Sequence, residues 1–316
     1  MAYAYWRAGR HTESAIFELF FRKCPFKGEY AIFAGLDQVI RFIRNFGFTA
    51  DDIAYLRSLP ALAGADSGFF EYLAQLDCSQ VVVSALPEGT ICFPRVTLIT
   101  VSGPLIVGQL LETTLLNLVN FPSLIATNAA RMRLAAGQDK TLLEFGLRRA
   151  QGPDGGISAS RYAFLGGFDG TSNVLAGKLS GINVSGTHAH AFVQSYTGWE
   201  NIKDPMLNGK NLVECVKAIK SAHEDWFGRT NESELAAFVG YALSFPDSFL
   251  ALIDTYDTCK SGLLNFIVVA LALHELGFKA KGVRLDSGDL AYLSKECRRI
   301  LSEAAKAFVD KVGCPK

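Results

Sequence analysis

Apolar and polar positions along the first hundred residues follow two different spacings. Leu36, Val39 and Ile43 recur three or four positions apart, which is the spacing of one face of a helix. Thr49, followed three positions later by Asp52, is typical of a residue that caps the start of a second short helix. Aromatic and β-branched runs bounded by turn residues predict short strands at 17–21, 80–86, 90–93 and 97–101. The pattern therefore predicts a small α+β region.

Two helices are expected after these strands, one over residues 105–119 and one over residues 122–136. Pro122 suits the first turn of a helix, where its missing amide is no loss, and Gly137 suits the position just beyond a helix end. We take residues 1–136 as an N-terminal α+β domain with its linking helices.

From about residue 141, short apolar runs end in polar or charged residues and are each followed by a helical segment. The five runs lie at 142–146, 165–168, 182–186, 250–253 and 281–285. Buried parallel strands have this pattern, with functional side chains at their carboxyl ends. A closed β/α barrel has eight such strands. We therefore predict an α/β fold in which the N-terminal region packs on an irregular, TIM-like β/α barrel over residues 137–316, incomplete in this chain.

Two further helical segments complete the expected second domain. Residues 200–245 form a helical excursion between the third and fourth strands, and an amphipathic helix over about 290–309 follows the fifth strand.

Composition and charge exclude several classes of protein. The 316 residues include 31 basic and 31 acidic residues, so the net charge gives no attraction to nucleic acid or to an acidic membrane. The most apolar stretch, at 96–119, is interrupted by glycine, proline and glutamate, so no membrane span is expected. Seven scattered cysteines and the lack of a secretory signal favour the reducing cytosol.

His190 is the most informative candidate for chemistry, because it lies in Gly-Thr-His-Ala-His at the end of an expected strand. Imidazole at such a position can act as a base, a ligand or a nucleophile, although a hydrogen-bonded structural histidine is the alternative. His188 and His190 share one face of an extended chain, which also permits a metal site and hence a metal-dependent barrel hydrolase.

Three arginines are candidates for binding an anion. Arg148 and Arg149 follow the first expected barrel strand, and their guanidinium groups suit phosphate or carboxylate unless they are simply exposed to solvent. Arg284 lies within an apolar strand, where a charge needs a partner. An ion pair with Asp254 or Asp286 and the capture of an anionic substrate both remain open for Arg284.

Carboxylates follow the last two expected strands, at Asp254, Asp257, Asp286 and Asp289. Sugar hydroxyls and Mg²⁺ both bind such oxygens, whereas capping of the next helix is the alternative. In 286–289 one carboxylate can face inward while the other caps the following helix. The glycine-rich turn at 166–173 can cradle an anion with its backbone amides, although it lacks the lysine of a phosphate-binding P-loop.

Taken together, these segments resemble the nicotinate phosphoribosyltransferase family of type II phosphoribosyltransferases. The resemblance extends from about residue 5 to residue 289, and its most specific blocks are 143–156, 166–177, 186–190 and 282–290. It implies an ATP-dependent, ligase-type enzyme that joins nicotinate and 5-phosphoribosyl 1-diphosphate into nicotinate mononucleotide and pyrophosphate in NAD salvage. It also implies Mg²⁺ (or Mn²⁺) with the phosphates and a homodimer that shares its active sites.

The resemblance also implies roles for individual residues. His190 matches the histidine that ATP phosphorylates, and Asp254 and Asp286 match carboxylates that face the ribose and the metal. The remaining matches are substrate-binding residues: Thr187 and Arg284 for nicotinate, Phe168 for stacking on the pyridine ring, Arg148 with its neighbour Arg149 near the phosphoribosyl group, and Ser172, an uncharged residue where the related nicotinamide enzyme carries an aspartate.

Two segments of the family pattern have no counterpart in the sequence. The Asp-x-Tyr-Gln segment would precede residue 1, and further strands with glycine-rich phosphate loops would follow residue 316. From these departures we expect a shortened form that is weakly active or inactive by itself. A non-catalytic partner of the full-length enzyme is therefore an alternative, with the metal-dependent hydrolase as a less favoured one.

Overall fold

The computed structural model describes residues 1–308, which form two compact units. The first unit comprises Met1–Ser185 and the second begins at Gly186. The expected domain boundary after residue 136 lies inside the first unit, at the end of a long helix. Residue 309, at the end of the last expected helix, and Cys314 lie outside the described residues.

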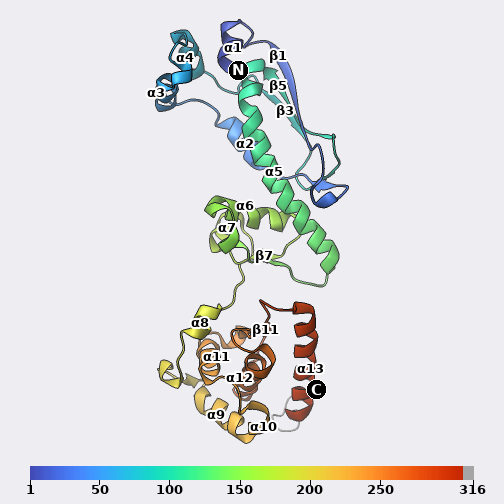
Figure 1. Cartoon of the computed structure of the whole chain (residues 1–316), viewed down its shortest axis with the longest axis vertical. Coiled ribbons are helices and arrows are strands. Elements are labelled where there is room, and N and C mark those ends of the chain that lie inside the picture. The colour runs from blue at the N-terminus through green and yellow to red at the C-terminus, as the bar shows by residue number, and fades with distance from the viewer. Residues whose placement is uncertain (309–316) are drawn as a thin grey trace. The chain divides into compact units, whose positions relative to one another are not determined.

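A three-stranded antiparallel sheet forms one part of the first unit (Figure 1). Its order is β1 (Ser14–Phe20), β5 (Thr97–Pro104) and β3 (Val82–Ala85), and a separate antiparallel pair joins β2 (Ala31–Ile32) to β4 (Ile91–Cys92). The four strands expected in the first hundred residues are confirmed, and β2 is an additional one. Apolar side chains from the sheet and from the neighbouring helices form one core.

Four short helices accompany this sheet. They are α1 (Ala2–Arg7), α2 (Leu36–Arg44), α3 (Ala50–Ser58) and α4 (Ser67–Ala74). The cap expected at Thr49 is confirmed, because the Asp52 amide donates to Thr49 Oγ1 at 3.2 Å and the Thr49 amide donates to Asp52 Oδ2 at 2.7 Å. This reciprocal pair satisfies amides that the first turn of a helix leaves free.

The prediction of two linking helices was wrong, because α5 (Leu105–Ala136) is a single helix that contains Pro122. Proline has no amide hydrogen, so the carbonyl of Leu118, four residues earlier, loses its helical partner. Gly35 lies against that carbonyl, and a Cβ at Gly35 would overlap Leu118 O. The helix also binds β2, because Thr127 Oγ1 accepts from the Ile32 amide at 2.8 Å and Ser123 Oγ accepts from the Ala34 amide at 3.0 Å. Packing on the β2 segment thus compensates for the proline.

The rest of the first unit contains α6 (Gly152–Leu165) and α7 (Val174–Ser180) beside a parallel pair, β6 (Leu143–Glu144) and β7 (Gly170–Thr171). Val184 extends this pair through a parallel bridge to Thr171. The strand expected at 165–168 was misplaced, because Leu165 ends α6 and the strand begins at Gly170. The reason is close packing of α6 on α5, since a Cβ at Gly166 would lie 2.5 Å from both Ala126 O and Ala129 Cβ.

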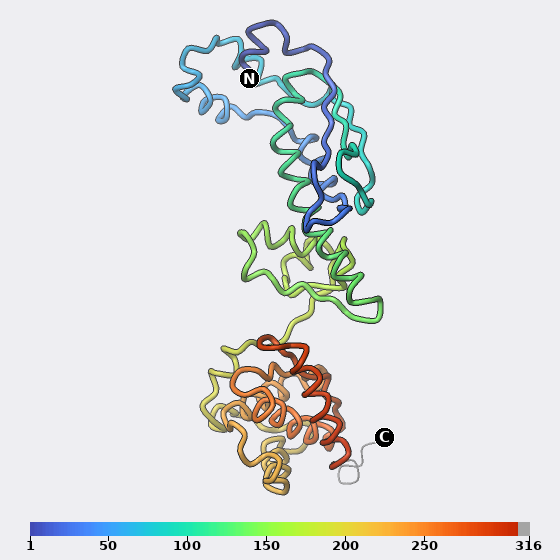
Figure 2. The backbone as a smooth tube through the Cα atoms, turned by 45° about the vertical axis from the view of Figure 1, so that its right-hand side comes forward, coloured from blue at the N-terminus to red at the C-terminus, as the bar shows by residue number. Residues whose placement is uncertain are grey.

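The second unit is mainly helical, as the yellow-to-red part of the tube in Figure 2 shows. Buried side chains of α12 (Leu263–Glu275) form part of its core. The expected excursion contains α9 (Leu212–Ala222), α10 (Glu224–Phe227) and α11 (Glu232–Ser244), preceded by α8 (His190–Gln194) and the hairpin β8 (Met206–Leu207) and β9 (Lys210–Asn211). The expected amphipathic helix is present as α13 (Leu290–Phe308), which ends where the described residues end. The fourth and fifth expected barrel strands are present as β10 (Leu250–Leu252) and β11 (Gly282–Arg284), which pair in parallel.

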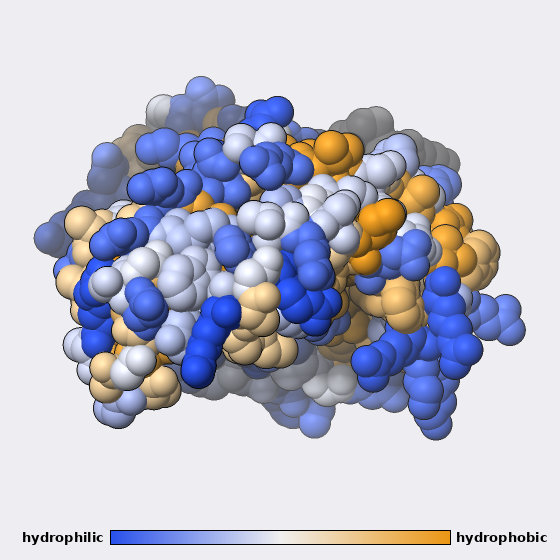
Figure 3. All heavy atoms as spheres, turned by 90° about the horizontal axis from the view of Figure 1, so that it is seen from above, coloured by the Kyte–Doolittle hydropathy of each residue, from blue (hydrophilic) through white to orange (hydrophobic). Residues whose placement is uncertain are grey.

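The five expected barrel runs do not form one sheet among residues 1–308. The first three meet at β6, β7 and Val184, whereas β10 and β11 form a separate pair. Residues 1–308 also contain no helix with the length and apolarity needed to span a membrane. The face shown in Figure 3 is hydrophilic or neutral over most of its area, with hydrophobic side chains in separate patches.

Candidate active site

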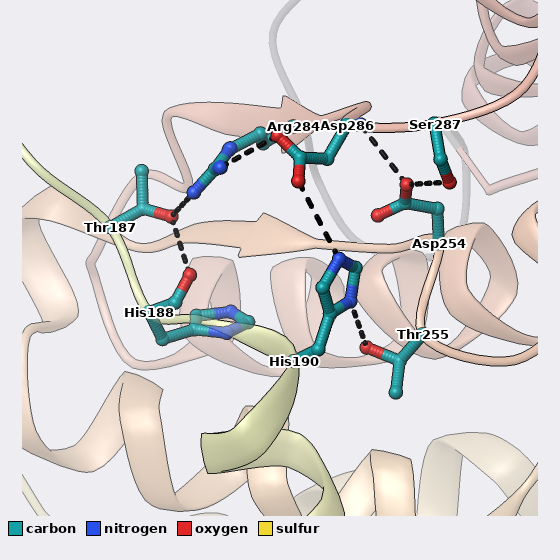
Figure 4. A network of polar contacts seen from close by, with 8 residues as sticks. All are labelled: Thr187, His188, His190, Asp254, Thr255, Arg284, Asp286 and Ser287. Carbon is teal, nitrogen blue, oxygen red and sulfur yellow. Dashed lines mark hydrogen bonds and ion pairs between the residues drawn. The ribbon is translucent and has the colours of Figure 1, made fainter. Parts of the chain in front are cut away.

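Polar side chains gather where β10 and β11 end (Figure 4). Asp254 and Thr255 follow β10, whereas Arg284 ends β11 and is followed by Asp286. Because the two strands are parallel, their carboxyl ends meet at one edge. The segment that leads into α8 crosses this edge and brings two more of the predicted residues, Thr187 and His190. The five site residues predicted in this unit therefore lie together.

His190 is held at both ring nitrogens. Its Nδ1 lies 3.2 Å from Thr255 Oγ1, and its Nε2 lies 3.6 Å from Asp286 Oδ2. The side chain keeps 37% of its surface exposed, so the ring is oriented by its neighbours and still reachable from solvent. His190 is the first residue of α8 rather than the last residue of a strand, because the run at 182–186 contributes only the bridge at Val184.

Arg284 pairs with Asp286, which is one of the two partners considered from the sequence. Its Nη2 donates to Asp286 Oδ1 at 2.7 Å, and its Nη1 lies 3.4 Å from Thr187 Oγ1. The guanidinium lowers the pKa of the Asp286 carboxyl, mainly through this hydrogen bond. Thr187 donates its own hydroxyl hydrogen to the carbonyl of His188 at 3.0 Å, which leaves the oxygen free to accept from Arg284. The site thus presents a cation and a hydroxyl side by side.

Asp254 links the two loops that follow the strands. Its Oδ2 accepts from the Asp286 amide at 3.1 Å and from Ser287 Oγ at 2.6 Å. Its Oδ1 is buried and has no hydrogen-bond partner within residues 1–308. Thr255 and Ser287 were not predicted, although each directly follows a predicted carboxylate, and this adjacency was the only signal for them in the sequence.

The other two carboxylates at these strand ends cap helices, which was the alternative considered for them. Asp257 Oδ1 accepts from the amides of Cys259 and Lys260 at 3.1 and 2.8 Å. Asp289 Oδ1 accepts from the Tyr292 amide at 2.9 Å at the start of α13. The segment 286–289 therefore has one carboxylate in the site and one on a helix, as expected.

His188 makes structural contacts, whereas the metal-binding His-x-His pair was only an alternative considered from the sequence. Its Nε2 accepts a hydrogen bond from the buried Leu252 amide at 3.1 Å, and its ring packs against Tyr241 with 4.7 Å between centroids. Burial lowers the pKa of His188 to about 4, so the ring is neutral. The Leu252 amide occupies Nε2, and Nδ1 is buried without a hydrogen-bond partner among residues 1–308. Of the two histidines only His190 is partly exposed, so these contacts give the metal-dependent hydrolase no support. The described residues contain no group of three or more side chains arranged for a metal ion.

The other four predicted residues belong to the first unit, around β6 and β7. Arg148 and Arg149 lie in an exposed 3₁₀ turn after β6, whereas Phe168 and Ser172 are half-buried on either side of β7. The Ser172 amide donates to the carbonyl of Glu144 at 2.9 Å.

Glu144 and Arg133 support these loops, and neither was predicted. The Glu144 carboxylate accepts from Ser160 Oγ at 2.7 Å and Thr171 Oγ1 at 2.8 Å, and also from the Gly146 amide. Arg133 donates to the carbonyl of Gly167 at 2.8 Å and pairs with Asp169 at 2.5 Å. The contacts with Ser160, Thr171, Gly167 and Asp169 join residues that are 16 to 36 positions apart, so sequence spacing gave no indication of them. Arg133 also donates to the nearer carbonyls of Gly137 and Lys140.

Comparisons with known proteins show which family this chain is similar to. Residues 1–120 match the family model described as the nicotinate phosphoribosyltransferase (NAPRTase) N-terminal domain. The chain is 56% identical over 312 residues to nicotinate phosphoribosyltransferase 1 of Arabidopsis thaliana and 53% identical over 325 residues to nicotinate phosphoribosyltransferase of Homo sapiens. These matches cover 95% and 98% of this chain.

Solved structures give the same result. The crystal structure of human nicotinic acid phosphoribosyltransferase superposes with a TM-score of 0.90 at 52% identity, over 98% of this chain and 64% of that one. A nicotinate-nucleotide pyrophosphorylase from Pyrococcus furiosus shares the fold, with a TM-score of 0.61 at 22% identity over 95% of this chain and 60% of that one. The chain spans 56% of the Arabidopsis protein and 59% of the human protein. With mixed helices and strands arranged as in these structures, and with more than half of its residues identical to those of such relatives, this chain belongs to the nicotinate phosphoribosyltransferase family.

Proposed function

We propose that this chain contributes to the synthesis of nicotinate mononucleotide and pyrophosphate from nicotinate and 5-phosphoribosyl 1-diphosphate, coupled to ATP hydrolysis, in NAD salvage. The observation that carries the proposal is His190, held between Thr255 and Asp286 beside the Arg284 guanidinium. Membership of the family supplies the reaction, and this cluster supplies residues suited to it.

His190 is the proposed phosphate acceptor. A ring nitrogen attacks the γ-phosphorus of ATP, the bond from that phosphorus to the bridging oxygen breaks, and ADP leaves. The contacts with Thr255 and Asp286 fix the ring plane, which lowers the entropic cost of aligning it for attack. The new phosphoryl group adds negative charge close to where the diphosphate of 5-phosphoribosyl 1-diphosphate is proposed to bind. It therefore changes the affinity for substrates and products.

Arg284 and Thr187 are proposed to bind nicotinate. The guanidinium pairs with the pyridine carboxylate, and neutral nicotinamide cannot form that ion pair. Phe168 is proposed to stack on the pyridine ring. Ser172 is proposed to favour the acid over the amide, because an uncharged side chain does not repel the carboxylate.

Carboxylates and arginines are proposed to bind the phosphoribosyl group. Departure of pyrophosphate leaves positive charge on the ribose, which Asp254 and Asp286 would stabilise, while Arg148 and Arg149 neutralise phosphate oxygens. The two aspartates also fit Mg²⁺ or Mn²⁺, since such ions use one or two carboxylates together with substrate phosphates, and Asp254 Oδ1 is buried without a partner among the described residues. When bound, the ion would neutralise the leaving diphosphate.

We also propose a domain organisation and an oligomeric state for the whole protein. Residues 137–316 would belong to an irregular β/α barrel with residues 1–136 as the N-terminal domain, and two copies would form a homodimer in the cytosol. Two pairs of parallel strands with predicted site residues after their carboxyl ends support this proposal.

The proposal is tested by incubating the purified chain with nicotinate, phosphoribosyl diphosphate, ATP and Mg²⁺, and by measuring nicotinate mononucleotide by chromatography. Product that disappears in His190→Ala supports the proposal and makes the expectation of a weakly active chain wrong. Product obtained only after segments from a full-length relative are joined to both ends would leave this chain a non-catalytic form. The lack of product from both proteins, each shown to be folded, would contradict the proposed reaction.

A further inference from the structure

A buried carboxylate lies in the second unit, outside the site described above. Glu234 on α11 is fully buried, and its Oε2 accepts from Ser261 Oγ at 2.6 Å and from Asn265 Nδ2 at 3.0 Å. Its Oε1 is also buried and has no hydrogen-bond partner within residues 1–308. Burial raises the pKa of the Glu234 carboxyl, which favours its neutral form. Burying a glutamate side chain costs free energy of folding, and an apolar side chain at this position would fill the core without that cost.

The hydrogen-bond partners of Glu234 connect α11 to the segment that follows the loop carrying Asp254 and Thr255. Ser261 lies in a π-helical turn, Thr258–Gly262, and Asn265 lies on α12 just after that turn. Ser261 Oγ also accepts from the Asn231 amide at 2.9 Å, and Asn265 Nδ2 donates to the Asn231 carbonyl at 2.9 Å. π-helical turns are rare and recur at functional sites.

The same turn fixes the loop that carries Asp254 and Thr255. The amides of Ser261 and Gly262 both donate to the carbonyl of Asp257 at 3.0 Å. Gly262 packs so closely on Ile253, which lies between β10 and Asp254, that a Cβ at Gly262 would overlap the Ile253 carbonyl oxygen. Both ends of the loop at 254–257 are thus held by the π-helical turn.

We propose that Glu234 is a positioning residue: by holding Ser261 and Asn265 it fixes the π-helical turn, and through it the loop that presents Thr255 to His190 and Asp254 to Ser287. The proposal concerns the geometry around His190 and does not depend on the proposed reaction, so each can fail without the other.

The test compares Glu234→Ala with Glu234→Gln in the full chain, with histidine labelled with ¹³C at Cε1. The chain has five histidines, so the His190 signal is identified by its loss in His190→Ala. Glu234→Ala is expected to move or broaden that signal and to speed amide exchange in 250–262 by about tenfold. Glu234→Gln is expected to resemble the wild type, because both hydrogen bonds go to one oxygen, which an amide can supply.

Val216→Ala is the matched control, since Val216 is fully buried on α9 and takes no part in this hydrogen-bond network. It weakens packing and is expected to leave the His190 signal unchanged. An unchanged signal and unchanged loop exchange in Glu234→Ala would overturn the proposal. Equal damage from Glu234→Gln or from Val216→Ala would overturn it as well. If Glu234→Ala does not fold, the same two measurements are made on Ser261→Ala, which removes one hydroxyl. A changed His190 signal with faster loop exchange supports the proposal, and no change in either overturns it.

Discussion

His188 and His190 are separated by one residue and occupy opposite environments. His188 is buried and accepts the Leu252 amide, whereas His190 is partly exposed between Thr255 and Asp286. The spacing indicated that the two rings could act together, but each ring finds its partners at strand ends much further along the chain. Local spacing therefore indicated the segment of the candidate site and could not distinguish the structural histidine from the candidate catalytic one.

His188 gives a prediction about acid stability. Its pKa is about 4 in the folded chain and near 6.5 unfolded, so the unfolded state binds the extra proton as the pH falls below 6.5. The stabilisation from the neutral ring is complete above pH 6.5 and is lost progressively down to about pH 4, by roughly 3 kcal/mol. His188→Gln, which can still accept from the Leu252 amide, does not titrate. Chemical denaturation between about pH 7.5 and 4.5 should show the free energy of unfolding falling more steeply in the wild type, and parallel slopes would contradict this.

Arg284 gives a prediction about ligand affinity. Arg284→Ala removes the guanidinium proposed to pair with nicotinate, and charge-assisted hydrogen bonds of this kind are worth about 1.5–3 kcal/mol. The Kd for nicotinate measured by calorimetry should therefore rise by roughly 10- to 100-fold, with no change for nicotinamide. Arg299→Ala on α13 is the control, because Arg299 pairs with Glu296 and Glu303 on its own helix. An equal loss in both variants would indicate a general effect of removing positive charge.

At the scale of elements, some helices and four antiparallel strands followed from the sequence, whereas α1, α4, β2 and the hairpin β8–β9 were not predicted. Periodicity and caps predicted α2, α3 and α13, because these signals are local. Pro122 was interpreted as a helix start, because its compensation by Gly35 and β2 is a contact between distant segments. The apolar run at 165–168 was interpreted as a strand because a short run fits either element, and packing on α5 makes its first part helical.

The contact between Gly35 and α5 is open to direct test. Gly35 has φ +103° and a Cβ there would overlap Leu118 O, so Gly35→Ala combines backbone strain with overpacking. We expect the free energy of unfolding of the first unit to fall by about 2–4 kcal/mol, as measured by chemical denaturation. Gly9 has φ +72°, and no atom of the described residues lies within 4 Å of the position that an added Cβ would take, so Gly9→Ala should cost only about 1 kcal/mol. Similar losses at the two glycines would mean that Leu118 O imposes no constraint.

At the scale of the whole molecule, the sequence predicted those residues of the candidate site that lie at the ends of expected strands. Thr187, His190, Asp254, Arg284 and Asp286 were expected together and lie together. Their supports were not foreseen: Thr255 and Ser287 within the site, and Glu234 behind it, act through contacts that depend on the folded chain. The sequence also could not show that the strand pairs β6–β7 and β10–β11 fall in different units, since strand order is a property of the assembled fold.

The second unit has a core of its own, which yields a final prediction. Its fully buried apolar side chains come from residues 193–308, and the contacts of His190 with Thr255 and Asp286 also lie within the unit. A fragment of residues 186–316 is large enough to bury a core, so we expect it to fold by itself and unfold cooperatively in urea. Its His190 ¹³C signal should match that of the full chain, because the fragment retains both Thr255 and Asp286. Val216→Ala should lower the urea midpoint of the fragment, which would show that the same core is formed. Gradual unfolding without a cooperative transition would mean instead that the first unit is required to complete this core.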